Sequence, residues 1–473
     1  MKRIAIIGGG IAGLSAAYYL EKARRSGHDL QWTLFEKSER LGGVIKTERR
    51  DGYVLEAGPD SFLAAKPDAR LLCQDLGIAD QLISSNDFQR KTYILVKGRL
   101  VPIPEGLEFM VPTRILPMAA TPLFSFTTKL RMMAELFSSD GSQSQYKDNE
   151  DEDESVADFV RRHFGQQMVD RVAEPLLAGV YGGNAENLSV RAVLPRFAEM
   201  EHESGSLVRA TLRARKARLK SNGQPQPLFT SLKNGMQQLV DTLVAALPAA
   251  GLRTQQSVRS VRRVNDAWQL EGASAPERFD SILLAVPAPA AAGLLQQIQP
   301  QLATMLGKIQ YTSSVAVALA YEKADLPPGF GFLVPRTEGR QMMACTFVHK
   351  KFPHRVPEGA VLLRCFFSSS RVSDLLSFSK ETLQEMARKE LREILGIDSQ
   401  PRFARTFLWD CAMAQYETGH LKRVAEMEKM LAGLPGVRVI GNSFYGIGIP
   451  DCIKSARQAV EKITSAVSLP VSV

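Results

Sequence analysis

Cysteine and histidine are scarce in this chain of 473 residues, which holds five cysteines and six histidines. The cysteines form no C-x-x-C pair, and their odd number and isolation argue against a disulfide framework. Scattered thiols of this kind are typical of a reduced, cytoplasmic protein. The histidines show no zinc-ligand spacing, so the sequence predicts no metal site.

Long apolar runs are also lacking. No run of 18 or more apolar residues occurs, so no transmembrane helix is expected. The nearest candidate, residues 109–126, contains Arg114 and three prolines, and prolines at that density break a helix. The sequence leaves open whether this segment makes a peripheral contact with a membrane.

Acidic residues are fewer than basic ones, with 50 Asp and Glu against 59 Lys and Arg, which gives a net charge of +9. This excess of positive charge indicates an anionic partner. No nucleic-acid-binding motif accompanies the charge, which argues against nucleic acid as that partner. An anionic small molecule and an anionic membrane surface stay open.

The start of the chain carries the strongest positive signal. Residues 3–7 form an apolar, strand-like run, a glycine-rich turn follows, and a helical pattern of small residues comes next. The spacing Gly8-x-Gly10-x-x-Gly13 is typical of a dinucleotide-binding turn. Gly8 allows the sharp exit from the strand, Gly10 lets the backbone approach a pyrophosphate, and Gly13 lets the helix lie close to the sheet.

A carboxylate further along the chain supports this interpretation. Residues 30–35 predict a second strand, and Glu36 follows it directly, with Lys37 next to it. A carboxylate roughly 20 residues beyond the last glycine accepts hydrogen bonds from a ribose. The two signals together predict a bound dinucleotide.

A second pair of glycines narrows the choice of cofactor. The chain continues as Arg40-Leu41-Gly42-Gly43-Val44, and a further turn reads Gly58-Pro59-Asp60-Ser61. A plain NAD-binding fold does not need a second glycine pair beside an arginine. These motifs resemble the signature of the flavin amine oxidase superfamily, and the resemblance implies FAD, with Arg40 and Gly43 near its pyrophosphate. No cysteine or histidine lies at an obvious flavin-tethering position, so non-covalent FAD is expected.

The expected fold class is α/β (α+β overall), with a Rossmann-type FAD-binding domain interleaved with two other domains. The FAD-binding domain is predicted over residues 1–95, 225–300 and 421–473. A mainly helical inserted domain is predicted over 105–220, and a mixed-sheet substrate-binding domain, with an antiparallel sheet, over 301–420. The acidic run within 140–154 repels itself and is expected to be a disordered loop. Residues 93–96 and 100–102 flank a Lys-Gly-Arg turn and predict a hairpin.

The end of the chain repeats the order of strand, glycine loop and helix over residues 441–453, with Pro450 in the first helical turn. A helix N-terminus placed there would face the flavin and stabilise its reduced anion. This segment, the turn at residues 58–62 and the run at residues 174–183 resemble the porphyrinogen oxidases of haem biosynthesis. The resemblance covers nearly the whole chain and is greatest for the soluble bacterial coproporphyrinogen III oxidases.

This resemblance implies FAD-dependent oxidation of coproporphyrinogen III to coproporphyrin III in porphyrin biosynthesis, with O2 as acceptor and H2O2 as product. Protoporphyrinogen IX stays open as the alternative substrate. A flavin amine oxidase and a non-catalytic flavin- or porphyrin-binding protein also stay open, as less favoured interpretations. Because the cofactor carries the redox chemistry, no catalytic side chain is nominated. The sequence leaves open whether the protein is a monomer or a homodimer.

The candidate site residues come from the motifs and from the resemblance. Val258 is expected to meet the adenine through its backbone, and Lys66, just beyond the turn at residues 58–62, is the candidate for binding the substrate. The candidate cofactor-binding residues are Gly8, Gly9, Gly10, Ile11, Ala12, Gly13, Glu36, Lys37, Arg40, Gly43, Val44, Gly58, Pro59, Asp60, Ser61, Val258, Trp409, Ile447, Gly448 and Ile449.

Overall fold

The computed structural model describes residues 1–136, 153–220, 227–272 and 275–465. The chain divides into two compact units. Unit 1 comprises Met1–Ser85, Pro227–Gln310 and Arg423–Val473, and unit 2 comprises Asn86–Gln226 and Tyr311–Lys422. The chain therefore leaves unit 1 twice and returns to it twice.

A parallel sheet forms the centre of unit 1, and every neighbouring pair of its strands is parallel. The central residues of β1, Ile4, Ala5 and Ile6, are fully buried, as expected for a strand covered on both faces. Chain order reverses at β1, the point where open α/β sheets bind ligands. The strand order is β12 (Leu252–Arg253), β2 (Leu30–Phe35), β1 (Lys2–Ile7), β16 (Ser281–Leu284) and β22 (Val437–Val439).

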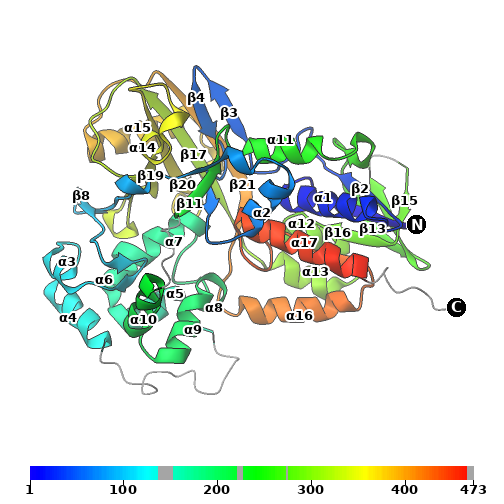
Figure 1. Cartoon of the computed structure of the whole chain (residues 1–473), viewed down its shortest axis with the longest axis horizontal. Coiled ribbons are helices and arrows are strands. Elements are labelled where there is room, and N and C mark those ends of the chain that lie inside the picture. Colours follow the sequence, from blue (N-terminus) through cyan, green and yellow to red (C-terminus); the bar gives the residue numbers. More distant parts are fainter. Residues whose placement is uncertain (137–152, 221–226, 273–274, 466–473) are drawn as a thin grey trace. The chain divides into compact units, whose positions relative to one another are not determined.

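Two helices from opposite ends of the chain pack together in unit 1. Helices α1 (Ile11–Arg25) and α17 (Ile449–Ser465) lie side by side in Figure 1, and Leu14, Leu20 and Ile453 are buried in their common core. The other helices of unit 1 are α2 (Asp68–Asp75), α11 (Gln237–Ala245), α12 (Ala288–Leu295) and α13 (Pro300–Gly307), while α16 (His420–Ala432) begins in unit 2 and continues into unit 1.

Three smaller sheets complete unit 1. They are the hairpin β3 (Thr47–Arg50)–β4 (Tyr53–Glu56), the sheet β5 (Phe62–Leu63)–β11 (Phe229–Leu232)–β6 (Leu82–Ser84), and the sheet β13 (Val258–Val264)–β14 (Ala267–Gly272)–β15 (Glu277–Phe279).

Unit 2 contains a larger, mixed sheet, in which all neighbours are antiparallel except β18 and β7. Alternate residues of β17, including Val315, Val317 and Leu319, join a core to which helix α15 (Lys380–Leu395) contributes Leu383. The strand order is β21 (Phe403–Ala414), β17 (Tyr311–Tyr321), β20 (Val361–Ser368), β19 (Ala344–Phe347), β18 (Gly331–Leu333), β7 (Thr92–Val96) and β8 (Arg99–Pro102). Because the β7–β8 hairpin pairs with β18, the first segment of unit 1 ends at Ser85, before the predicted boundary at residue 95.

The first segment of unit 2 is mainly helical. Its elements are the hairpin β9 (Leu107–Glu108)–β10 (Val111–Pro112), then α3 (Ile115–Ala120), α4 (Phe126–Glu135), α5 (Val156–Phe164), α6 (Gln166–Met168), a π-helical turn (Val169–Ala173), α7 (Glu174–Tyr181), α8 (Val190–Val193), α9 (Pro195–Ser204) and α10 (Leu207–Lys220); α14 (Val348–Lys351) follows in the second segment. The predicted α/β fold class is confirmed. The division of unit 2 into a helical and a sheet domain stays a prediction.

The predicted disordered loop at residues 140–154 lies outside the described residues except for its last two. Asp153 accepts a hydrogen bond from the Gly419 N–H at 2.7 Å, and Glu154 forms an ion pair with Arg162 at 2.6 Å. For these two residues the prediction was wrong, because tertiary partners hold the end of the acidic run in place.

Candidate cofactor site

The opening strand, turn and helix have the geometry that the glycine spacing predicts. Gly8 has a φ of +110°, and a Cβ there would collide with the carbonyl of Ala285. A Cβ at Gly13 would collide with the carbonyl oxygen of Gly8. The first glycine therefore serves the conformation of the turn, and the last one serves the close packing of α1 on the sheet.

Gly10 differs from these two glycines because space surrounds it. Apart from Gly10 itself and its two chain neighbours, no described atom lies within 4 Å of the position that a Cβ would take. Gly10 is also the N-cap of α1, where no side chain of the described residues caps the helix and the first turn carries no acid. The N–H groups at this helix start and the space beside them fit the pyrophosphate of a dinucleotide, which binds at the positive end of a helix.

The second glycine pair lies directly against the first. The Gly42 N–H donates to the Gly9 carbonyl at 2.7 Å, and a Cβ at Gly43, where φ is +57°, would lie 3.2 Å from the Gly10 Cα. These contacts place the Gly42–Gly43 turn beside the open space at Gly10.

Arg40 stabilises the Gly42–Gly43 turn through hydrogen bonds to backbone carbonyl groups. Its guanidinium donates to the carbonyls of Leu41 at 2.9 Å and Ile45 at 2.8 Å, and also to that of Gly43. Burial lowers the pKa of Arg40 from its ordinary value. The side chain thus shapes the loop through its carbonyls and adds positive charge to the turn.

Glu36 lies at the end of β2, next to the first glycine turn. One carboxylate oxygen accepts the Gly9 N–H at 2.7 Å, and the other accepts the Ser38 N–H at 2.9 Å. The second oxygen also accepts the Ser38 hydroxyl. A carboxylate has about four lone-pair sites, so about one is left for a ribose hydroxyl. The neighbouring Lys37 is exposed.

The turn that begins at Gly58 packs against the end of the second glycine loop. A Cβ at Gly58 would collide with the carbonyl oxygen of Val44, whose own side chain is exposed. The Asp60 carbonyl accepts the Ser231 hydroxyl at 2.7 Å, and the Asp60 carboxylate accepts the Ser61 hydroxyl at 2.7 Å. Ser231 is a residue that the sequence analysis missed, since no local motif points to its long-range bond.

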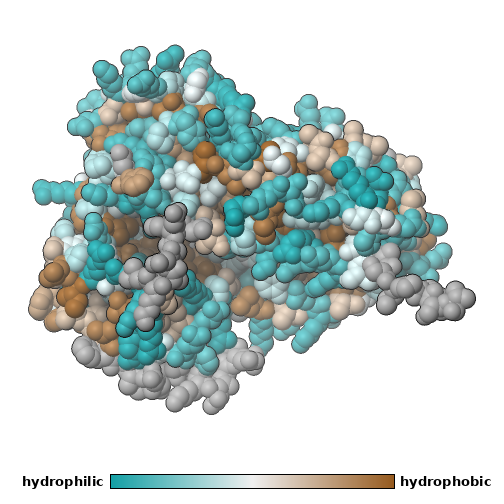
Figure 2. Space-filling view, viewed as in Figure 1, coloured by the Kyte–Doolittle hydropathy of each residue, from teal (hydrophilic) through white to brown (hydrophobic). Residues whose placement is uncertain are grey.

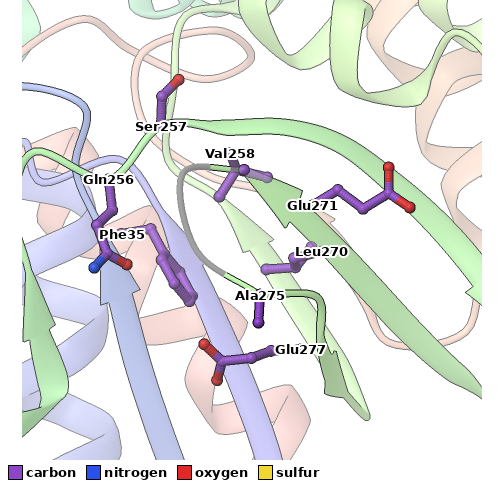
Figure 3. Close-up of a pocket in the computed structure, with 9 residues that line it drawn as sticks. Phe35, Gln256, Ser257, Val258, Leu270, Glu271, Ala275 and Glu277 are labelled. Carbon is purple, nitrogen blue, oxygen red and sulfur yellow. The ribbon is translucent and has the colours of Figure 1, made fainter.

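A shallow hollow lies beside the end of β2, and Figure 3 shows the residues around it. It opens to solvent. Phe35 and Leu270 give it apolar walls, and the Gln256 N–H donates to the Glu36 carbonyl at 2.9 Å. Val258 belongs to the lining, so this candidate lies in the same region of unit 1 as Glu36. Of the lining residues, sequence reasoning named only Val258.

The closing glycine turn, residues 446–449, leads into α17. A Cβ at Gly441 would lie 3.6 Å from the Ala12 Cβ, so the strand end before this turn meets the start of α1. At the helix start, the Asp451 carboxylate accepts the Gly448 N–H at 3.2 Å and binds Lys66 Nζ with both oxygens at 2.7 Å. The Lys66 ammonium therefore has a carboxylate partner that the sequence analysis did not foresee.

Trp409 is the one candidate cofactor residue in unit 2. It lies half-buried on β21, opposite Ser314 of β17. All the other candidate cofactor residues belong to unit 1, together with Lys66. Among the residues that the structure describes, no cluster of three or more His, Cys, Asp or Glu side chains could hold a metal ion. Within the same residues, no helix is long and apolar enough to cross a membrane.

The fold and this site define a dinucleotide-binding protein of the Rossmann type, with the glycine turn at the point where strand order reverses. The family model for flavin containing amine oxidoreductases matches residues 11–464. The chain belongs to this family, and it is an FAD-dependent oxidase.

Three relatives are similar over nearly their whole length. The coproporphyrinogen III oxidase of Bacillus subtilis (strain 168) is 34% identical and covers 97% of this chain and 97% of its own length. The coproporphyrinogen III oxidase of Staphylococcus aureus (strain NCTC 8325 / PS 47) is 30% identical and covers 98% and 99%. The crystal structure named "Putative protoporphyrinogen oxidase from Exiguobacterium sp. 255-15" has a TM-score of 0.86 at 30% identity and covers 98% of this chain and 99% of that one.

Proposed function

We propose that this enzyme oxidises coproporphyrinogen III to coproporphyrin III with O2 as the electron acceptor. The reaction removes six electrons and six protons in three two-electron steps, and each step reduces one O2 to H2O2. FAD, when bound, supplies the redox chemistry by carrying two electrons at a time from substrate to O2. The observation that carries the proposal is the full-length similarity to relatives named coproporphyrinogen III oxidase.

The chain's own part in this reaction is to bind and orient. The N–H groups at the start of α1, beside Gly10, are proposed to hold the FAD pyrophosphate, and Glu36 its ribose. The hollow that includes Val258 is proposed to receive the adenine. The turn at residues 447–449 is proposed to lie at the flavin ring, where the N-terminus of α17 favours the reduced anion. The part of Trp409 stays a prediction.

We expect coproporphyrinogen III to be oxidised faster than protoporphyrinogen IX at low salt. The first substrate carries four propionates and the second carries two, and the protein has a net charge of +9. The measurement is O2 consumption with each substrate over a range of salt concentrations. The preference should shrink as salt rises, because the Debye length falls to about 8 Å at physiological ionic strength.

FAD content, read from the visible absorbance, serves as the control and should not change with salt. If the preference for coproporphyrinogen III does not change with salt concentration, substrate choice is steric, at the vinyl or propionate groups. No O2 consumption with either substrate would contradict the proposed function itself.

We also propose that unit 2 contacts an anionic membrane surface peripherally. Figure 2 shows apolar surface gathered over α3 and α4. No acidic residue occurs between positions 109 and 134, whereas three basic ones do. An exposed apolar patch with basic neighbours suits the interface of an anionic bilayer. This apolar patch comprises Phe109, Ile115, Leu116, Phe126, Leu130 and Met133.

We propose that the protein is cytoplasmic, because its cysteines are free thiols.

The wild-type protein should sediment with phosphatidylglycerol vesicles and not with phosphatidylcholine vesicles. The double variant Leu116→Glu/Phe126→Glu should lose this binding, because Leu116 and Phe126 are 82% and 73% exposed and would carry negative charge onto an anionic surface. Leu71→Glu, at an exposed leucine of unit 1, is the matched control and should bind like wild type. Wild-type protein that stays in the supernatant with both lipids would refute the membrane contact.

A further inference from the structure

One ion pair joins two segments of unit 1 that are 385 positions apart in the sequence. Lys66 Nζ lies 2.7 Å from each carboxylate oxygen of Asp451. The Lys66 side chain is 44% exposed and that of Asp451 is 16% exposed. The carboxylate is therefore the more buried partner, and the lysine reaches it from the solvent side.

Asp451 is at the same time part of the closing glycine turn. Its Oδ2 accepts the Gly448 N–H at 3.2 Å. Gly446 has a φ of +77°, and a Cβ there would collide with the Asp451 carboxylate group. The carboxylate thus lies against Gly446 and accepts a hydrogen bond from Gly448, so it contacts this turn at two residues.

The other end of the pair is anchored in the Gly58 turn and its strand. Lys66 follows β5 closely, and its N–H donates to the Leu63 carbonyl at 3.2 Å. β5 pairs with β11, which also provides Ser231 to the Asp60 carbonyl. The Lys66–Asp451 pair therefore connects two of the turns that are proposed to surround FAD.

An ion pair of this exposure contributes little to stability. Its electrostatic effect on a neighbouring redox group is different in kind. The intact pair places no net charge beside the turn, whereas loss of one partner leaves a full charge there. A negative charge near a group that accepts electrons makes reduction harder, and a positive charge makes it easier.

We propose that Lys66 is a positioning residue that acts through Asp451: it holds the closing turn in place and neutralises the carboxylate beside the flavin. In this role Lys66 does not bind a substrate propionate. The inference rests on the proposed function, because it takes the turn at residues 447–449 to lie at the flavin ring.

The test measures the midpoint reduction potential of FAD in the purified holoenzyme. Lys66→Met should lower the potential, because the Asp451 charge is left without its partner, and Asp451→Asn should raise it. The double variant should return close to the wild-type value, and Lys66→Arg should keep it. Both single variants should also weaken FAD binding severalfold in titrations of the apoprotein, since the turn is no longer held.

The neighbouring ion pair provides a matched control. Arg457 Nη2 lies 3.1 Å from Asp68 Oδ1 and joins α17 to α2, and Arg457 lies further along α17 than Asp451. Arg457→Met and Asp68→Asn should leave the FAD potential unchanged. If the FAD potential shifts as much in these controls as in the Lys66 and Asp451 variants, then any loosening of α17 is sufficient to change the potential. That result would overturn the specific role of Lys66.

Steady-state kinetics separate this role from substrate binding. If Lys66→Met raises the KM for coproporphyrinogen III and leaves the potential unchanged, while Asp451→Asn changes neither, then Lys66 binds substrate and the inference is wrong. If wild-type protein binds FAD but oxidises no porphyrinogen, the proposed function fails, and opposite potential shifts in the two single variants would still support the pair's role at the flavin.

Discussion

Gly10→Val should abolish FAD binding while leaving the fold of the apoprotein intact. The backbone of Gly10 is extended, with φ −73° and ψ −178°, so valine can adopt it without strain. Apart from the two chain neighbours of Gly10, no described atom lies within 4 Å of the new Cβ, and the side chain enters the space proposed for the pyrophosphate. The purified variant should be colourless where the wild type is yellow, and circular dichroism should show the same secondary structure.

The variant should also lose the stabilisation that bound cofactor provides, about 2.7 kcal/mol when free FAD is at 100 times its dissociation constant. Gly293→Val is the matched control, because Gly293 is an exposed glycine of α12. Apart from its chain neighbours and the backbone of its own helix, no described atom lies within 4 Å of the position that a Cβ would take. It should bind FAD like wild type. A yellow Gly10→Val protein with full FAD content would place the pyrophosphate elsewhere.

His163→Ala should destabilise the protein by about 3 kcal/mol, because it breaks a buried charge cluster in unit 2. The two ring nitrogens of His163 lie 3.2 Å from Glu135 and 3.1 Å from Glu201, and the His163 side chain is 4% exposed. Glu135 also accepts the Leu207 N–H at 2.7 Å at the start of α10. The expected loss in the free energy of unfolding is at the low end for a broken buried ion pair. The reason is that Glu135 still accepts the Leu207 N–H and Glu201 still binds Arg162. Chemical denaturation of both proteins measures the difference.

His202→Ala is the matched control for this variant. His202 lies on α9 and is exposed, so its replacement should change the free energy of unfolding by no more than about 0.5 kcal/mol. An equal effect of the two substitutions would show that the buried contacts of His163 do not stabilise the fold.

The same cluster predicts a pH dependence of stability. Burial of the ring favours neutral His163, but its hydrogen bonds to Glu135 and Glu201 raise the pKa of His163 above its ordinary value of 6.5. The stabilisation that His163 contributes to the folded protein is therefore complete below pH 6.5 and is lost as pH rises through its folded-state pKa. Burial opposes ionisation of Glu201, yet its bonds to His163 and Arg162 lower the pKa of Glu201 to about 2. The stabilisation that Glu201 contributes is present above pH 4.5, the ordinary pKa of a glutamate, and is lost as pH falls toward 2.

Melting temperatures across this range test the assignment of His163. The difference in melting temperature between wild type and His163→Ala should be largest between about pH 4.5 and 6.5 and should become smaller as pH rises further. A gap that stays constant from pH 5 to pH 9 would contradict a charged His163 in the folded protein.

The features of this protein that could be predicted from its sequence are those whose physics is local. A glycine with φ above zero, a glycine without room for a Cβ and a carboxylate after a strand are each recognised from a few neighbouring residues. The backbone roles of Gly8 and Gly13 and the place of Glu36 beside the glycine turn could therefore be predicted from spacing. The binding role of Glu36 stays a prediction. The hairpin at residues 93–102 was predicted for the same reason and is confirmed as β7 and β8. The α/β class followed from the alternation of such local signals.

Which distant groups meet could be learned only from the folded chain. The sequence analysis offered Lys66 as a candidate for binding the substrate, and nothing near it in the chain shows that Asp451, 385 positions away, has its carboxylate 2.7 Å from Lys66 Nζ. Likewise, no spacing rule brings Glu135, His163 and Glu201 together, since their contact depends on how α4, α5 and α9 pack. The β7–β8 hairpin was readable locally, but its pairing with β18 in unit 2 was not. Long-range partners depend on how preformed elements dock, and that choice is made by the buried surface of the whole unit rather than by any short stretch of sequence.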